Sequence, residues 1–194
     1  MAIDDRQFIP ITWGWLQRVT RTDCDDVMLV AMLADWRDRN AAAFPTRFPK
    51  DTEATKTWLR TQIVENDDRD LFLIVDSRDR AIGHIGFSIK GDCEEFEIEN
   101  VVRGVPDVYP GIMGRAMEAM IRWIGEEYGP PIISLRVLEE NAHAIRFYRD
   151  LGFVVTGRTP LVTVVDGERT SLVPTPDAES GDAAFIRMEY RGVR

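Results

Sequence analysis

The sequence has few of the residues on which metal and disulfide chemistry depends. Two cysteines and two histidines occur among its 194 residues. Cys24 and Cys93 form no Cys-x-x-Cys pair and neither clusters with a histidine, so the sequence offers no zinc site and we expect no bound metal. We expect two buried, unpaired thiols, because free cysteines behave mostly as small apolar side chains.

Long apolar runs and a basic excess are missing as well. No run approaches the roughly 18–20 apolar residues that span a bilayer. Residues Met1 to Asp5 are acidic and lack the layout of a signal peptide, which predicts a cytoplasmic protein with no membrane partner. The formal net charge of −9 argues against nucleic acid as a partner. It is compatible with a cationic acceptor, although many proteins are acidic for solubility alone.

The apolar content of 44% suits one folded domain, which we expect to span residues 1–194. Apolar periodicity, turn residues and proline positions predict its elements. In chain order they are a strand at 16–20, helices at 25–39 and 51–65, strands at 71–76, 81–90 and 94–102, a helix from 111 to about 128, a strand at 132–138, a helix at 141–151, a strand from 153, a hairpin at 162–170 and a strand at 184–190. This order of meander and crossover predicts an α/β fold (α+β, mixed sheet) with helices on both faces.

Two segments resemble a known family. The stretch Asn-Ala-His-Ala-Ile-Arg-Phe-Tyr-Arg-Asp-Leu-Gly-Phe, from Asn141 to Phe153, resembles the N-xx-A-xx-x-Y-xx-x-G-F segment of the GNAT (Gcn5-related N-acetyltransferase) superfamily. The strand, loop and helix from Glu97 to Ile124 are similar to its acyl-CoA binding motif. The resemblance is clearest over residues 25–190. It implies a GNAT fold, with a mostly antiparallel central sheet of six to seven strands that is splayed in the middle.

The loop before the third helix departs from the family pattern R/Q-G-x-G-x-G/A. It reads Tyr-Pro-Gly-Ile-Met-Gly from Tyr109, with a proline at one glycine position, and Arg103-Gly104 lies too far upstream for the usual register. A glycine turn that opens a helix offers a pyrophosphate both N–H donors and the positive end of the helix dipole. The alternative is a simple helix-start turn. The resemblance implies that acetyl-CoA is bound by Val101, Val102, Arg103, Gly104, Gly111, Ile112, Met113, Gly114, Asn141 and Phe147.

The resemblance assigns protonation of the leaving CoA thiolate to Tyr148. A half-buried aromatic residue with a satisfied hydroxyl is the alternative, and Asn141 also suits a helix N-cap. An amine acceptor arrives protonated and needs a base. Glu99 or Glu97 on the third strand of the meander is the candidate, against a solvated polar face as the alternative. His84 is a further candidate, although an ordinary strand histidine explains it as well.

The early segment resembles GNAT enzymes that acylate small amines, including amino sugars and nucleotide-linked amino sugars. By position, Trp36, Arg37, Phe44 and His84 are candidates for acceptor binding. A nucleotide-linked acceptor predicts basic residues in the cleft, whereas an aminoglycoside predicts acidic ones. The resemblance therefore implies acetyl transfer from acetyl-CoA to a primary amine of a small molecule, by a monomer or homodimer. Alternatives are acetylation of protein N-termini or aminoglycosides, and a non-catalytic acyl-CoA-binding module.

Overall fold

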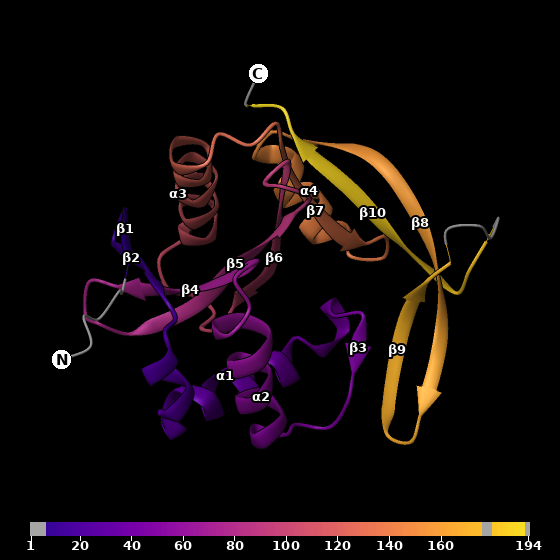
Figure 1. Ribbon diagram of the computed structural model, residues 1–194, viewed down its shortest axis with the longest axis horizontal. Coiled ribbons are helices and arrows are strands. Elements are labelled where there is room, and N and C mark those ends of the chain that lie inside the picture. Colours follow the sequence, from indigo (N-terminus) through magenta and orange to yellow (C-terminus); the bar gives the residue numbers. More distant parts are fainter. Residues whose placement is uncertain (1–6, 176–179, 193–194) are drawn as a thin grey trace.

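The strands of this computed structural model, which describes residues 7–175 and 180–192, form one sheet (Figure 1). Its order is β1-β2-β4-β5-β6-β7-β10-β8-β9-β3. The strands are β1 (Phe8–Ile11), β2 (Gly14–Arg18), β3 (Thr46–Arg47), β4 (Arg69–Asp76), β5 (Ala81–Lys90), β6 (Glu95–Arg103), β7 (Ile132–Leu138), β8 (Phe153–Asp166), β9 (Arg169–Pro174) and β10 (Ala183–Tyr190).

The ten strands exceed the six to seven that the family resemblance implies. Part of the difference lies at the N-terminus, where β1 and β2 form an antiparallel hairpin instead of a single strand at 16–20. Pro10 is tolerated because β1 is an edge strand. Gly14 is needed because a Cβ there would lie 1.9 Å from the carbonyl oxygen of Val75 on β4. Both residues look like interruptions in the sequence, yet both belong to strands. The acidic residues 1–5 lie outside the described part of the chain.

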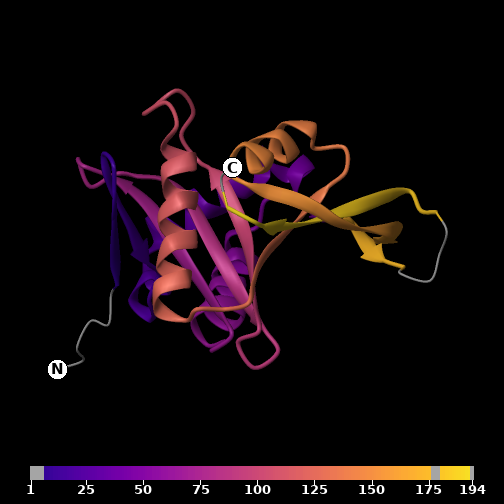
Figure 2. The ribbon, with the colours of Figure 1, turned by 90° about the horizontal axis from the view of Figure 1, so that it is seen from above.

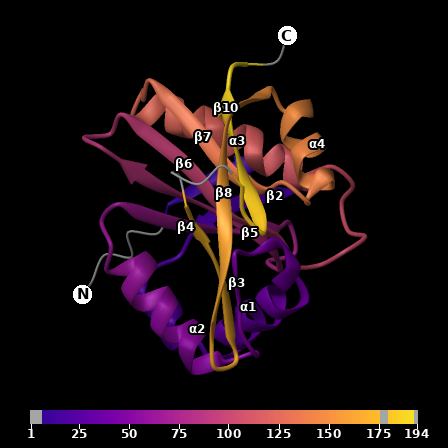
Figure 3. The same cartoon turned by 90° about the vertical axis from the view of Figure 1, so that its right-hand side faces the viewer.

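Helices cover both faces of the sheet, as predicted. They are α1 (Val27–Arg39), α2 (Thr52–Trp58), α3 (Ile112–Glu127) and α4 (Ala142–Asp150). In Figure 3, α1 and α2 lie on one side of the central strands, and α3 and α4 lie on the other. Two separate apolar clusters result, one that includes side chains of α3 and α4 and one that includes side chains of α1.

The first two helices differ in detail from the prediction. Asp26 caps α1 by accepting hydrogen bonds from the N–H groups of Met28 and Leu29, so the helix begins at Val27 and not at residue 25. The helix predicted at 51–65 is α-helical over Thr52–Trp58 and continues as a π-helical segment, Leu59–Val64.

The last strands form an arm that projects beyond the helices (Figure 2). The strand predicted from 153 and the first half of the predicted hairpin are one 14-residue strand, β8. Its partner β9 pairs with the two-residue strand β3, and the N–H of Leu172 donates to the carbonyl of Pro45 at 2.7 Å. The arm therefore returns to the loop after α1. The sequence between the predicted hairpin and the last strand is polar from 174 to 182 and favours a loop, but its residues 176–179 lie outside the described residues.

One expectation about the thiols is wrong. Cys24 is buried, but Cys93 is exposed in the turn between β5 and β6, where its φ is 62°. Within 7–175 and 180–192, no group of three or more His, Cys, Asp or Glu side chains is arranged to hold a metal ion. A search of the same residues for helices long and apolar enough to cross a membrane finds none.

Candidate active site

A cavity opens where β6 and β7 separate. These parallel strands pair over four residues, from Glu95 opposite Ile132 to Ile98 opposite Leu135. Asn100 then adopts a φ of 53° at an irregularity in the β5–β6 register, and this bulge turns β6 away from β7. The space between them, here called the central cavity, has a volume of about 500 Å³. Its lining includes Glu97, Glu99, Asn100 and Val101 from β6, Arg136, Val137 and Leu138 from β7, and Asn141, Ala144 and Tyr148 from α4 and its cap.

A second cavity of about 340 Å³, here called the aromatic cavity, adjoins the first. The two cavities share the side chains of Arg37, Phe44, Thr46, Trp58 and Asn100 in their walls. Phe48, His84 and Arg169 complete its aromatic and cationic lining, together with Leu33, Ala54 and Thr55. Together the two cavities extend from α4 to the loop after α1.

Tyr148 contributes the phenol of the central cavity. It is 9% exposed, and burial raises its pKa to about 12. The phenol is therefore protonated near neutral pH. Asn141, two turns earlier, accepts a hydrogen bond from the N–H of Ala144 at 3.1 Å and so caps α4. Because Asn141 also lines the cavity, the cap and the predicted ligand contact are compatible.

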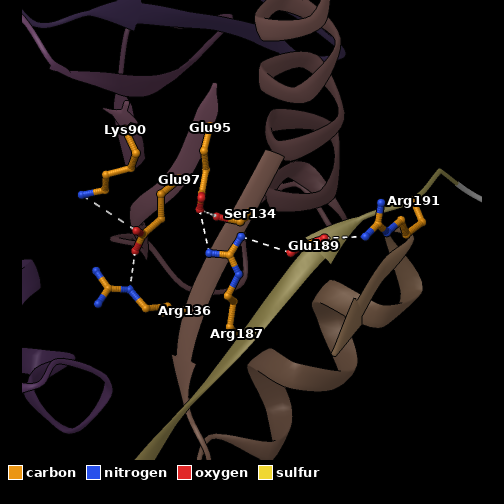
Figure 4. A network of polar contacts seen from close by, with 8 residues as sticks. All are labelled: Lys90, Glu95, Glu97, Ser134, Arg136, Arg187, Glu189 and Arg191. Carbon is orange, nitrogen blue, oxygen red and sulfur yellow. Dashed lines mark hydrogen bonds and ion pairs between the residues drawn. The ribbon is translucent and has the colours of Figure 1, made fainter. Parts of the chain in front are cut away.

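The two glutamates of β6 have different surroundings. Glu97 is 7% exposed and accepts a hydrogen bond from Nε of Arg136 at 2.6 Å, with Lys90 at 3.9 Å (Figure 4). Glu99 is half-buried and has a weaker partner, Arg69, at 3.7 Å. Burial raises the pKa of Glu99, and repulsion from Glu97 raises it further. Glu99 is therefore a carboxylate of raised proton affinity, which suits a base.

A network of ion pairs holds the strands beneath these glutamates. Glu95 of β6 accepts from Ser134 of β7 and from Arg187 of β10, and Arg187 also contacts Glu189 at 3.1 Å (Figure 4). These contacts tie β6, β7 and β10 together at the end where β6 and β7 still pair. The network thus fixes the strands at the closed end of the splay.

His84 lies in the wall of the aromatic cavity. Its Nδ1 is 2.6 Å from the carbonyl oxygen of Asn100. A carbonyl only accepts, so Nδ1 carries the proton and Nε2 keeps a free lone pair. Burial lowers the pKa of His84 to about 4, which leaves the ring neutral near pH 7. Trp36 stacks on this ring at 6.1 Å between centroids, is 3% exposed and lines neither cavity. Trp36 therefore packs in the core and does not line either cavity, unlike the position predicted for an acceptor-binding residue.

The predicted pyrophosphate loop is open at its glycines. Gly111 precedes α3 with a φ of 83°, and a Cβ there would meet nothing within 4 Å. A Cβ on Gly114 would lie 4.0 Å from Cδ2 of Leu151, so the first turn of α3 lies beside the end of α4. Ile112 is 1% exposed and anchors this turn in the core, and Met113 packs on the same cluster.

The upstream Arg103-Gly104 pair has structural partners. Arg103 donates to the carbonyls of Val105 and Val108, and the N–H of Gly104 donates to the carbonyl of Ile82 at 2.9 Å. These donors hold the loop between β6 and α3. Val102 is only 3% exposed, and Phe147 packs at the edge of the core. Val101, in contrast, lines the central cavity. Among the β6 residues predicted for acetyl-CoA, Val101 is thus the one in the cavity wall.

Gly104 offers a direct test of this packing. A Cβ at Gly104 would lie 2.0 Å from Cε2 of the buried Trp36 ring. We expect Gly104→Ala to lower the free energy of unfolding by about 3 kcal/mol, measured by urea denaturation, because a full core must shift to admit the methyl group. Gly125→Ala is the control: it is exposed in α3 with open space around it, and helix propensity favours alanine there. Equal stabilities of the two variants would contradict this account.

Several cavity residues escape prediction from the sequence, among them one phenylalanine and three arginines. Phe48 and Arg169 come together through the β3–β9 pairing, and Arg69 and Arg136 face the cavity from β4 and β7. The predicted hairpin around Asp166-Gly167 places Arg169 just after a turn. No local pattern reveals that this strand pairs with β3, because a two-residue strand is too short to show alternation.

Comparisons with known proteins agree with this geometry. The family model described as an acetyltransferase (GNAT) domain matches residues 15–154. A probable GNAT-family acetyltransferase from Chromobacterium violaceum superposes with a TM-score of 0.71 at 18% identity, covering 94% of this chain and 84% of that one. A search of curated protein sequences finds no match.

Two further solved structures share the fold. The spermidine N-acetyltransferase from Vibrio cholerae, in complex with CoA and spermine, has a TM-score of 0.66 at 16% identity and covers 92% of this chain and 95% of that one. RimL, a ribosomal L7/L12 alpha-N-protein acetyltransferase, has a TM-score of 0.67 at 12% identity, with coverages of 97% and 95%. With the family model spanning most of the sequence and the sheet splayed as predicted, the chain belongs to the GNAT family of N-acetyltransferases.

Proposed function

We propose that this enzyme transfers an acetyl group from acetyl-CoA to a primary amine of a small molecule within the central cavity. The observation that carries the proposal is the convergence of Tyr148, Glu97 and Glu99 on that cavity. A phenol kept protonated and a carboxylate of raised pKa are the acid and the base that aminolysis of a thioester requires.

The residues present suit acetyl-CoA, which supplies the acyl group and a thiolate leaving group. The open turn from Gly111 to Gly114 would receive the pyrophosphate, because its backbone can approach closely and α3 directs the positive end of its dipole there. Val101, just past the bulge of β6, and Asn141 would line the path of the pantetheine arm into the cavity.

Two proton movements follow from the surroundings. Glu99, as the carboxylate, takes a proton from the incoming ammonium group, so that a neutral amine attacks the acyl carbon. Tyr148 gives its phenolic proton to the sulfur as the carbon–sulfur bond breaks. A pKa of about 12 makes Tyr148 a weak acid. Burial in the same cavity also raises the proton affinity of a thiolate, which keeps the two groups matched. The products are an N-acetyl amide and the CoA thiol.

We favour a small acceptor over a protein N-terminus, because the aromatic cavity, of about 340 Å³, has the size of a small-molecule site. The β3–β9 pairing, with Thr46 opposite Ser171 and Arg47 opposite Thr170, contributes to its wall. Amino sugars and nucleotide-linked amino sugars remain among the small amines proposed. Thiol release from acetyl-CoA, measured with a panel of amines and with a peptide N-terminus, tests this proposal. Release with the peptide alone would contradict it.

A negative charge introduced in the first turn of α3 should change the affinity for CoA without lowering the stability of the fold. We expect Gly114→Asp to weaken binding of CoA by about tenfold in calorimetry, because its carboxylate repels a pyrophosphate. The same substitution is expected to leave stability unchanged or higher, since an acidic side chain at a helix N-terminus is favourable. Gly125→Asp, in the last turn of α3, adds the same charge and should bind CoA normally. Equal CoA affinities for both variants would place the pyrophosphate elsewhere.

A further inference from the structure

Two arginines of the aromatic cavity have no acidic partner in the part of the chain that the structure describes. The guanidinium of Arg37 lies 4.5 Å from the ring centre of Phe44 and 4.6 Å from that of Phe48. Its Nη2 donates to the carbonyl of Thr46 at 3.1 Å, one of the five N–H groups that an arginine offers. Neither Arg37 nor Arg169 forms an ion pair with a carboxylate among the described residues.

The arginines of the central cavity differ in this respect. Arg69 is paired with Glu99 and Arg136 with Glu97, so their charges are balanced within the wall. The lining of the aromatic cavity contains no Asp or Glu. Arg169 also lines a shallow depression beside this cavity, whose acidic residues are Asp51, Glu53, Asp166 and Glu168. Within the described residues, the aromatic cavity therefore holds two arginines that form no ion pair, in a protein whose net charge is −9.

Holding these charges together costs free energy. Burial lowers the pKa of Arg37, and repulsion from Arg169 lowers it further. Both guanidinium groups nevertheless remain charged, since arginine does not lose its proton in proteins. The stacking of Arg37 between two phenylalanines fixes its position. Arg169 is brought to the cavity by the β3–β9 pairing, from a point 132 residues further along the chain (169 − 37). Such an arrangement is unfavourable alone and favourable around an anion.

We propose that the amine acceptor carries an anionic oxygen group, a phosphate or a carboxylate, which Arg37 and Arg169 bind in the aromatic cavity. This inference rests on the proposed function, because the acceptor's amine must reach Glu99 in the adjoining central cavity. The side chains of Arg37 and Asn100 belong to both cavities, so one molecule spans them. Phe44, Phe48 and Trp58 offer apolar surface to the part between the anion and the amine. A polyamine, which is cationic at every nitrogen, would be repelled.

Matched amines that differ in the anion alone test the proposal. D-glucosamine 6-phosphate is compared with D-glucosamine, and L-phenylalanine with 2-phenylethylamine; spermidine is the cationic reference. Binding to the CoA-saturated protein is measured by calorimetry, and turnover by thiol release from acetyl-CoA. In at least one pair we expect the anionic member to bind at least about tenfold more tightly, as for a charge-assisted bidentate contact. The pair that shows the preference identifies phosphate or carboxylate as the anion.

Arg169→Gln locates the anion. This side chain makes no hydrogen bond or ion pair among the described residues, so its loss should not disturb folding. We expect the variant to lose most of the preference for the anion-bearing amine, with a rise in its Kd of about tenfold, and to keep the affinity for the matched amine that lacks the anion. Arg122→Gln, an exposed position of α3 that lines neither cavity, is the matched control and should behave as the wild type.

The outcomes separate this inference from the proposed function. Equal affinities within both pairs, no binding of either anionic amine, or a preference for spermidine would each overturn it. A raised KM for acetyl-CoA in Arg169→Gln would also overturn it, because the arginines would then contact phosphates of the donor. A preference for the anionic amine that Arg169→Gln removes, without any thiol release, would uphold the anion site and contradict the proposed transfer.

Discussion

Replacing Tyr148 by phenylalanine is expected to lower kcat by about 10² to 10³-fold, the usual contribution of a general acid, and to leave CoA binding nearly unchanged. The measurement is thiol release at saturating acetyl-CoA and amine, with calorimetry of CoA on the same variant. The effect falls on kcat because the phenolic proton is needed when the carbon–sulfur bond breaks and not when the substrates bind.

The substitution isolates the hydroxyl group. The Tyr148 ring packs against Phe147 and Phe153, with ring centres 5.3 and 6.0 Å away, and a phenylalanine keeps both contacts. Of the two substitutions Tyr148→Ala and Tyr148→Phe, the second therefore removes the acid without opening a hole in the core. We expect its stability to stay within about 1 kcal/mol of the wild type, the usual net value of one hydrogen bond.

Tyr190→Phe is the matched control. Tyr190 is also partly buried and lies 5.5 Å from Phe153 between ring centres, but it lines neither cavity. It should retain the wild-type rate. If Tyr148→Phe retained that rate as well, the proton on the thiol would have another source, and the assignment of Tyr148 would be wrong.

The sequence predicts the parts of the site that local patterns encode. The cap at Asn141 and the periodicity of α4 place Tyr148 on a helix, and the alternation of β6 places Glu97 and Glu99 on one face. Strict alternation would put Asn100 on the face of Phe96 and Ile98, but the alternation fails there. The bulge there turns its side chain to the cavity, where its Nδ2 donates to Glu99.

Two adjacent residues, one in the core and one in the cavity wall, show why the proposed acceptor site was harder to predict. Trp36 and Arg37 are adjacent in α1, so their side chains point about 100° apart on the helix. Trp36 continues the apolar face of Leu29 and Leu33 into the core, whereas Arg37 reaches the aromatic cavity. The same periodicity that predicts α1 thus argues against Trp36 as an acceptor contact.

Other parts of the site depend on long-range contacts that leave no local pattern. The loop after α1 has two prolines and reads as irregular structure, yet Thr46 and Arg47 pair with β9. Because that pairing adds Arg169 and Phe48 to one cavity, the charge of the proposed acceptor site depends on contacts between segments far apart in the sequence. A net charge of −9 did not reveal a cavity lined by two unpaired arginines.

Glu99→Gln is expected to lower kcat/KM by about 10²-fold near neutral pH, because the amide cannot take a proton from the acceptor. The dependence of kcat/KM on pH should also differ between the wild type and the variant. Burial raises the pKa of Glu99, so the carboxylate becomes protonated, and the enzyme slows, as the pH falls through this raised pKa. The variant has no such group and should lose the acidic limb that belongs to Glu99. The measurement is kcat/KM as a function of pH for both proteins.

Stability should change in the opposite direction. A carboxyl group whose pKa is higher in the folded than in the unfolded protein favours folding at low pH, and that contribution is lost as the pH rises through the folded pKa. At neutral pH the ionised Glu99 therefore opposes folding, and Glu99→Gln should be at least as stable as the wild type. Loss of rate with no loss of stability is the combination expected of a residue retained for chemistry.

Two other glutamates complete the comparison. Glu94→Gln, exposed in the turn before β6, should change neither rate nor stability. Glu97→Gln removes the partner of Arg136 and should lower the stability that Glu99→Gln preserves. A wild-type pH profile for Glu99→Gln, together with a lost acidic limb for a folded Glu97→Gln, would move the base to Glu97. That outcome would not affect the cavity or the role proposed for Tyr148. The pH profiles therefore decide which of the two carboxylates accepts the proton.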